Sequence, residues 1–166
     1  MASRRKGRIL AFQALYCWEA NRIPADELMT FSWLESEKQA ALDSGIAGFS
    51  RLLIAGTIEN IKVVDSMIKR HLQNWDISRL NRVDLAILRM SVYALIFQTD
   101  IAPSIIIDEA IGISKEFGTD VSYRFINGVL DSIRRTLQEP QPDSALRAAS
   151  EQAAPKQAQE VCLSTK

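Results

Sequence analysis

Four cations open the chain before any acidic residue appears. Arg4, Arg5, Lys6 and Arg8 all precede Glu19, the first carboxylate. The residues that follow predict a helix from about Arg4, and the start of a helix is already electropositive, so each cation there costs roughly a few tenths of a kcal/mol. A polyanion such as RNA or DNA would compensate for that cost. The alternative interpretation is a disordered arm that only keeps the protein in solution.

A glutamine and a tyrosine follow the cations on the same predicted helical face. Arg5, Ile9, Gln13 and Tyr16 recur at spacings of three and four, so one side of the helix presents all of them. A glutamine amide can pair with a base edge, and a tyrosine ring can stack on a base, as in many single-stranded RNA complexes. Taken alone, Tyr16 also fits a core position.

A second candidate patch lies near the end of the chain. Phe125 is one position away from the apolar stripe of its predicted helix, between Arg124 and Asn127. An aromatic ring placed in this way can serve as a stacking platform for a base, although a residue at the boundary of the core fits the same pattern. Asn127 and Gly128 cost about 1 kcal/mol inside a helix, which close packing or a nearby ligand would explain.

No set of residues predicts catalysis or metal binding. Asp108 and Glu109 are adjacent, so a helix points them about 100° apart, unlike a cooperating carboxylate pair. His71 is the only histidine and is expected to flank the end of its helix. Cys17 falls among apolar residues, where a buried and inert thiol is expected, and Cys17 and Cys162 form no CxxC motif. We therefore expect no enzymatic activity, no metal and no cofactor.

The elements that position these residues are all predicted to be helices. Apolar spacing indicates helices over residues 4–20, 26–34, 38–72, 77–97, 103–117 and about 122–137, with a possible bend at Gly56 in the third. Gly118 is expected to close the fifth helix in a left-handed conformation, and Asp120 or Ser122 to cap the sixth. No strand-like alternation competes, so the fold class is all-α.

The helix over residues 77–97 is apolar around almost its whole circumference, which is typical of a central, buried helix. Arg89 lies within it. A guanidinium in such a place predicts a buried ion pair, for which Asp84 and Glu109 are candidate partners.

Composition sets the outer limits. Twenty basic and twenty acidic residues cancel, so attraction to a nucleic acid must come from local clustering. Residues 1–138 form one expected helical domain, while residues 139–166 are rich in Pro, Gln and Ala and are expected to be a disordered tail. No stretch resembles a signal peptide or approaches the roughly 20 apolar residues of a membrane span. A cytoplasmic location without membrane contact is expected.

Three separated motifs resemble the NusB family. RRKGRILAFQALYCWE is similar to its arginine-rich opening and its Gln-Ala-Leu-Tyr signature, here residues 13–16. RVDLAILRMSVYALIF, residues 82–97, resembles its central helix. IIIDEAIGISKEFGTDVSYRFINGVLDSI, residues 105–133, resembles its closing pair of helices, with Phe-Gly at 117–118 and Asn-Gly-Val-Leu at 127–130. The resemblance runs in order over roughly residues 4–135 and is weakest in the middle.

The resemblance implies a compact, single-domain bundle of about seven helices that acts in transcription antitermination and ribosomal RNA synthesis. Its ligand would be boxA-type single-stranded RNA, bound together with the ribosomal protein NusE within an RNA polymerase antitermination complex. Carried over by motif, the RNA surface would comprise Arg4, Arg5, Lys6, Arg8, Gln13, Tyr16 and Phe125. The partner surface would comprise Asp84, Ile101, Pro103, Ser104 and Asp120.

The chain departs from the family pattern at three positions. Val121 stands where an acidic residue is common, so a polar contact to the partner lacks its carboxylate. Asp108 replaces a usual asparagine, and Gly112 a common glutamate.

Three other hypotheses compete with that of an RNA-binding adaptor. The chain could be an accessory domain of an RNA methyltransferase, which requires a catalytic domain with a glycine-rich cofactor loop downstream, and this sequence contains no such loop. It could be a protein-interaction bundle with a passive N-terminal arm, which predicts no saturable binding to RNA. A homodimer that covers the RNA face is the third.

Overall fold

The chain folds into helices throughout the part that the structure, a computed structural model, describes, which is residues 2–73 and 75–139. Within these ranges there are eight α-helices, one 3-10 turn and no strand, which confirms the all-α prediction. The helices are α1 (Ala2–Asn21), α2 (Ala25–Leu28), α3 (Ser36–Ala40), α4 (Ser44–Glu59), α5 (Ile61–His71), α6 (Arg82–Phe97), α7 (Pro103–Phe117) and α8 (Ser122–Gln138), with the 3-10 turn η1 at Ile77–Arg79.

The predicted tail, apart from Glu139, lies outside the described residues. No helix of the described ranges combines the length and the apolar character that a membrane crossing needs.

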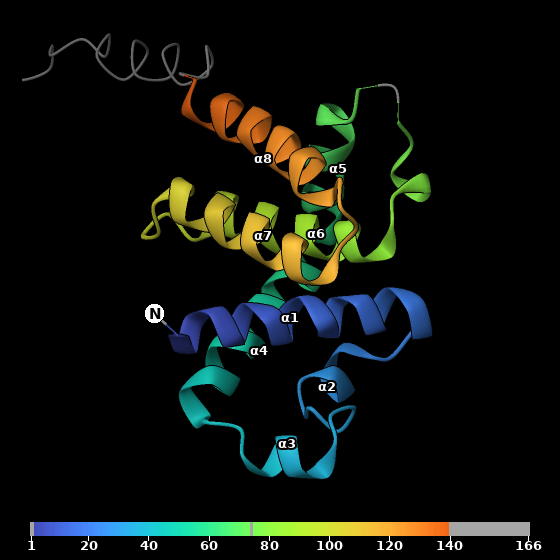
Figure 1. Cartoon of the computed structure of the whole chain (residues 1–166), viewed down its shortest axis with the longest axis vertical. Coiled ribbons are helices and arrows are strands. Elements are labelled where there is room, and N and C mark those ends of the chain that lie inside the picture. Colours follow the sequence, from blue (N-terminus) through green and yellow to red (C-terminus); the bar gives the residue numbers. More distant parts are fainter. Residues whose placement is uncertain (1, 74, 140–166) are drawn as a thin grey trace, which may run out of the picture.

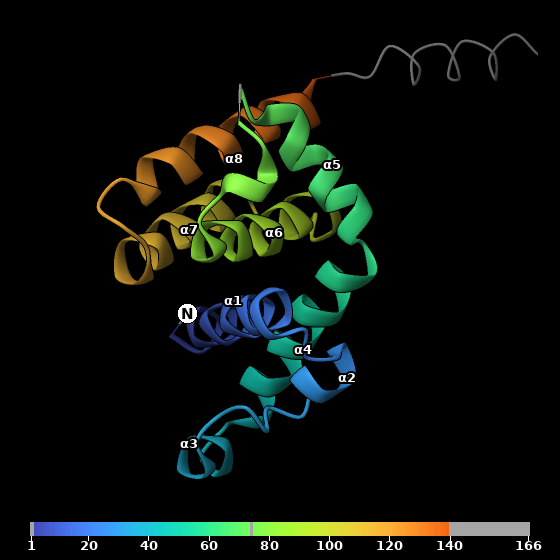
Figure 2. The same ribbon diagram turned by 90° about the vertical axis from the view of Figure 1, so that its right-hand side faces the viewer.

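Helix α6 is the centre of the molecule. It packs against α1, α4, α5, α7 and α8, and every residue from Asp84 to Val92 is buried. The apolar circumference of the sequence therefore predicted its place correctly. In Figures 1 and 2, α1 lies between the layer formed by α6, α7 and α8 and the segment formed by α2 and α3. Helix α1 therefore has neighbours on two sides and one long face that these helices leave open.

Helices α1 and α4 cross closely because Gly7 lacks a side chain. A Cβ at Gly7 would lie 2.6 Å from Cδ1 of Phe49, so only glycine lets the ring approach the helix. Next to it, the Ser50 hydroxyl donates a hydrogen bond of 3.0 Å to the Gly7 carbonyl in a buried place. This crossing fixes the first two turns of α1 against the core.

The segment predicted as one helix over residues 38–72 is instead divided into α3, α4 and α5. Helix α4 starts where Asp43 accepts hydrogen bonds from the backbone N–H groups of Gly45 and Ile46. The bend predicted at Gly56 is wrong: the break falls at Asn60, between α4 and α5 (Figure 2). Gly56 has a packing role, because a Cβ there would overlap the ring and hydroxyl of Tyr93 on α6.

Two predictions about the α7–α8 corner are also wrong. Gly118 is extended, with φ −90° and ψ −168°, rather than left-handed. It is crowded instead, since an added Cβ would lie 2.6 Å from the Ser114 carbonyl oxygen. Neither Asp120 nor Ser122 caps α8 by a side-chain hydrogen bond. The Ser122 hydroxyl accepts a hydrogen bond from the Thr119 N–H and so closes the turn from inside the helix.

Candidate nucleic-acid interface

The four cations of the first helical turns fall into three different environments. Arg4 and Lys6 are exposed. Arg8 is only 6% exposed, and its guanidinium lies 5.4 Å from the centre of the Phe49 ring, with that of Arg4 5.8 Å from the same ring. Burial lowers the pKa of Arg8, while the charge of Glu109 opposes the shift. Arg8 therefore lies against the protein, and Arg4 and Lys6 face solvent.

Arg5 is held by two carboxylates of α7. Its Nη2 lies 3.1 Å from Oε2 of Glu116, and its Nη1 lies 3.6 Å from Oε2 of Glu109. Gly112 stands between these two acids on the same face of α7, and a Cβ there would lie 2.7 Å from the Arg5 Nη1. The small residue thus makes room for the guanidinium. All three groups are partly exposed, so an incoming phosphate can compete with Glu116 for Arg5.

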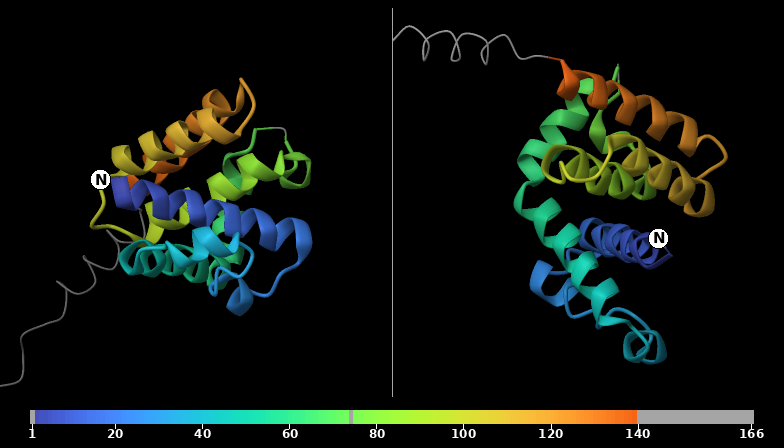
Figure 3. Two further views of the ribbon diagram at one scale, coloured as in Figure 1. Left: turned by 60° about the horizontal axis from the view of Figure 1, so that its bottom comes forward. Right: turned by 90° about the vertical axis from the view of Figure 1, so that its left-hand side faces the viewer.

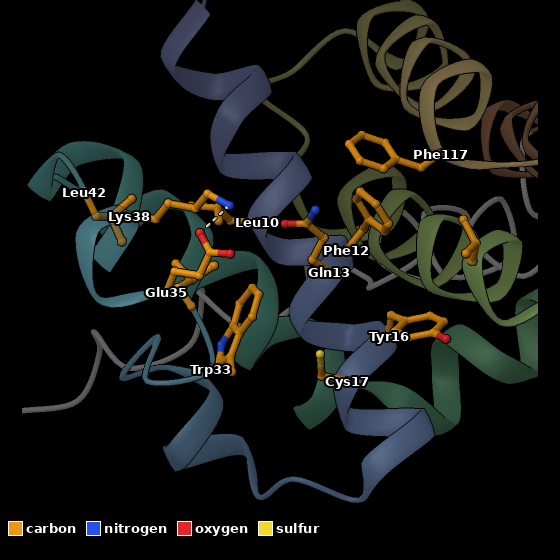
Figure 4. Close-up of a pocket in the computed structure, with 12 residues that line it drawn as sticks. Leu10, Phe12, Gln13, Tyr16, Cys17, Trp33, Glu35, Lys38, Leu42 and Phe117 are labelled. Carbon is orange, nitrogen blue, oxygen red and sulfur yellow. Dashed lines mark ion pairs between the residues drawn. The ribbon is translucent and has the colours of Figure 1, made fainter. Parts of the chain in front are cut away.

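The middle of α1 lines an open groove of about 590 Å³. Leu10, Gln13 and Cys17 project from α1 along its floor, and Figure 4 shows walls on both sides of the helix. On one side stand Trp33 and the Glu35–Lys38 ion pair, whose atoms are 2.9 Å apart. On the other side stand Tyr16, Phe12 and Phe117 (Figure 4).

The structure brings Gln13 and Tyr16 together in this groove, as their spacing predicts. Tyr16 is 37% exposed, which favours the binding interpretation over a core position. Phe12 and Phe117 fill the wall behind it, with ring centres 5.0 Å apart. Burial raises the pKa of the neighbouring Cys17 thiol, in keeping with the inert thiol that was expected, although Cys17 is only partly buried.

Phe125 belongs to a different helix from the cations. It is partly buried in the first turn of α8, and the ribbon views show α6 and α7 between α8 and α1 (Figures 1 and 3). Its neighbours form a second basic and aromatic cluster, in which Lys115 and Arg124 lie 5.0 Å and 5.6 Å from the Tyr123 ring centre. The candidate surface on α1 is therefore accompanied by a second, separate basic and aromatic cluster at the α7–α8 corner.

The residues expected to contact a protein partner differ in exposure. Ser104 and Asp120 are exposed, while Ile101 and Pro103 are half-buried. Asp84 is 8% exposed, and Oδ1 has no hydrogen-bond partner among the described residues. Burial raises the pKa of the Asp84 carboxyl, and a hydrogen bond with Ser122 partly offsets the shift.

The predicted buried ion pair of Arg89 exists, but both suggested partners are wrong. Nε and Nη2 of Arg89 donate to the two carboxylate oxygens of Asp65, each at 2.9 Å, and Nη1 donates to Glu19 at 2.9 Å. The guanidinium also lies 5.6 Å from the Trp18 ring centre. These contacts join α1, α5 and α6, so Arg89 orients the helix that carries the candidate surface.

Sequence reasoning missed Trp33, Lys38 and Lys115, and it included Tyr123 in the second patch without its contact to Lys115. Trp33 and Lys38 belong to irregular or very short segments, where periodicity gives no orientation. Lys115 and Tyr123 belong to different helices, so only the α7–α8 corner brings them together. No group of three potential metal ligands occurs in the residues that the structure describes, and His71 ends α5 as expected, with Nδ1 2.9 Å from the Ser132 hydroxyl.

A family model described as the NusB family matches residues 5–135. A Treponema denticola protein named transcription antitermination protein NusB is 53% identical over 131 residues, covering 79% of this chain and 95% of the relative. A Geobacter sulfurreducens protein of the same name is 42% identical over 139 residues, covering 84% and 99%.

Solved structures agree with this match. T. maritima NusB superposes with a TM-score of 0.71 at 34% identity, covering 87% of this chain and 96% of that chain. A chain from the crystal structure of the antitermination factors NusB and NusE in complex with dsRNA has a TM-score of 0.73 at 27% identity, covering 82% and 98%.

Proposed function

The chain belongs to the NusB family, and from that premise we propose that it is a non-enzymatic adaptor of transcription antitermination that binds boxA-type single-stranded RNA together with a NusE-type ribosomal protein. The related structure that holds NusB, NusE and RNA supports both kinds of partner. The proposed place of action is the RNA polymerase antitermination complex in the cytoplasm.

One observation carries the RNA part of the proposal. Arg4 and Lys6 face solvent at the electropositive start of α1, and Arg5 beside them is held only by partly exposed carboxylates. These cations lead into a groove lined by Gln13 and Tyr16. Phosphate contacts at the helix start would position a strand, and the amide and ring groups would contact its unpaired bases.

The seven proposed RNA contacts have different roles in this scheme. Phosphates are neutralised by Arg4 and Lys6, and by Arg5 once it has left Glu116. Arg8 anchors the helix start on Phe49 and adds charge at short range. Phe125, on α8, is a separate stacking position.

The proposed protein-binding surface is the rim of α6, α7 and α8. Ser104 and Asp120 offer exposed polar groups there, and Ile101 and Pro103 offer half-buried apolar ones. Asp84 is only 8% exposed, and its Oδ1 is buried without a partner among the described residues. A hydrogen-bond donor of the partner would reach that oxygen only through a shift of the rim on binding, and pairing would remove the cost of leaving it unsatisfied.

A titration of RNA binding tests the proposal. The variant Arg4→Ala/Lys6→Ala should bind a boxA-type single strand more weakly, and the slope of log affinity against log salt should become shallower by about 1.4, at about 0.7 for each lost contact. The matched control is Lys62→Ala/Arg70→Ala, which removes the same two charge types from exposed positions of α5.

The titration is repeated with a NusE-type protein present, which should tighten RNA binding by the wild type. Circular dichroism verifies that helix content is unchanged in both variants. Equal affinities for the wild type and the Arg4/Lys6 variant would refute the proposed surface. Absence of saturable binding at physiological salt, with and without the partner, would favour a protein-interaction module instead.

A further inference from the structure

The groove on α1 has a wall that its family motifs do not account for. Trp33 stands in the connection between α2 and α3 and is half-buried against the core. Its indole N–H donates a hydrogen bond of 3.0 Å to the Leu28 carbonyl. Since the only polar group of the side chain is used internally, what Trp33 can offer to a ligand is the face of its ring.

The connection that carries Trp33 is held in a demanding conformation. Phe31 is 1% exposed and has φ 60°, a left-handed value that costs free energy in any residue with a Cβ. Arg51 of α4 secures it, with its guanidinium 5.1 Å from the Phe31 ring centre and its Nε donating to the Met29 carbonyl at 2.9 Å. Such strain persists only where the surroundings enforce it, and it frequently accompanies function.

The groove is continuous with the cationic turns. Leu10, which lines its floor, lies one helical turn after Lys6. Figure 4 shows Trp33 and Tyr16 on opposite sides of α1, with Gln13 between them. Lys38 stands at the outer rim and neutralises Glu35, so the acid in the groove does not present an unpaired charge to a phosphate. The volume of about 590 Å³ falls within the range of small-ligand pockets.

We propose that the Trp33 side of this groove is a further base-binding position, in which an unpaired base of the bound RNA stacks on Trp33. The Gln13 amide, which is both donor and acceptor, hydrogen-bonds the edge of that base. The next base of the strand crosses α1 and stacks on Tyr16. This inference rests on the proposed RNA-binding function and extends it, because it adds a stacking residue and a path across α1.

Replacement of Trp33 tests the inference in the full chain. Trp33→Leu should weaken binding of a boxA-type single strand by about fivefold or more, the lower end of what one base–aromatic stack contributes. Trp33→Phe keeps a ring and should lose less. The control is Trp75→Leu, since Trp75 is 62% exposed in the η1 connection and lies outside this groove. This control should bind RNA as the wild type does.

A second measurement does not depend on the stability of the Trp33 variants. Gln13→Leu should reduce the discrimination between the preferred strand and a strand changed at one base. A photoreactive uridine at the same position of the RNA should form its crosslink on Trp33 or Tyr16, as mapped by peptide mass spectrometry.

The outcomes separate this inference from the function on which it rests. If Arg4→Ala/Lys6→Ala weakens RNA binding while Trp33→Leu leaves it unchanged, no base stacks on Trp33 and the adaptor role stands. If the wild type does not bind RNA, both fail. If Trp33→Leu weakens binding of the NusE-type protein in the absence of RNA, the groove docks a protein and the inference is overturned.

Discussion

Removal of the Glu116 carboxylate should strengthen RNA binding. Arg5 is paired with Glu116 at 3.1 Å, and the Glu116 side chain is 51% exposed. An ion pair in such a setting contributes roughly 0.2–1 kcal/mol. If Arg5 must leave Glu116 to reach a phosphate, Glu116→Gln recovers at most that amount. The affinity should therefore rise by about 1.4- to 5-fold.

The control separates this competition from a change in net charge. Asp108→Asn removes the same charge from an exposed position of the same helix, next to Glu109, and should alter the affinity less. A double-mutant cycle with Arg5→Ala completes the design. In the Arg5→Ala background, Glu116→Gln should have no more effect than Asp108→Asn.

Fluorescence anisotropy with labelled single-stranded RNA measures all these affinities at several salt concentrations. The gain from Glu116→Gln should shrink as salt rises, because both the ion pair and the phosphate contact are screened. If Glu116→Gln and Asp108→Asn act equally in the wild-type background, Arg5 does not exchange its carboxylate for a phosphate. The reasoning about Arg5 would then be refuted.

Three further predictions concern stability, each measurable by urea unfolding. Because burial raises the folded-state pKa of Asp84, the charge of its carboxylate opposes folding above the unfolded-state pKa of about 3.9. Asp84→Asn should therefore stabilise the protein by about 1 kcal/mol at pH 7, and this gain should vanish below about pH 4. A gain that does not depend on pH would contradict this cause. Arg89→Met should destabilise by roughly 3 kcal/mol, since it strands the Asp65 carboxylate in a partly buried place; an unchanged midpoint would show that the ion pair contributes nothing net. Gly56→Ala should cost about 1–3 kcal/mol through overlap with Tyr93, and combination with Tyr93→Leu should remove most of that cost, failing which the overlap is not its source.

Much of the fold could be predicted from the sequence because helical periodicity is a local property. The apolar circumference of residues 82–97 predicted a central helix, and the structure buries α6 on all sides. Helix boundaries were less accurate within residues 38–72, where Asp43 and Asn60 divide one apolar stripe into separate helices. A stripe that continues across a break does not reveal the break, since the capping residues lie on its polar side.

The candidate site was predicted only in its parts. Residue types and spacing located the cations of α1 and the Gln13–Tyr16 pair, because both depend on one helix. Phe125 was expected beside them, whereas it belongs to α8, which the ribbon views separate from α1 by α6 and α7 (Figure 3). The distance between two helices depends on how they pack, which their separate periodicities do not specify.

By itself, then, the chain's order of residues determined the all-helical class and which helix is buried, since both follow from a repeat of about 3.6 residues, and it determined where positive charge accumulates. The tertiary structure alone decided that Arg5 meets Glu109 and Glu116, that Arg89 meets Asp65 and Glu19, and that Trp33 stands against α1. Those pairings join residues far apart along the chain. They form because ridges of side chains on one helix must fill the grooves of another, a condition that no single helix contains.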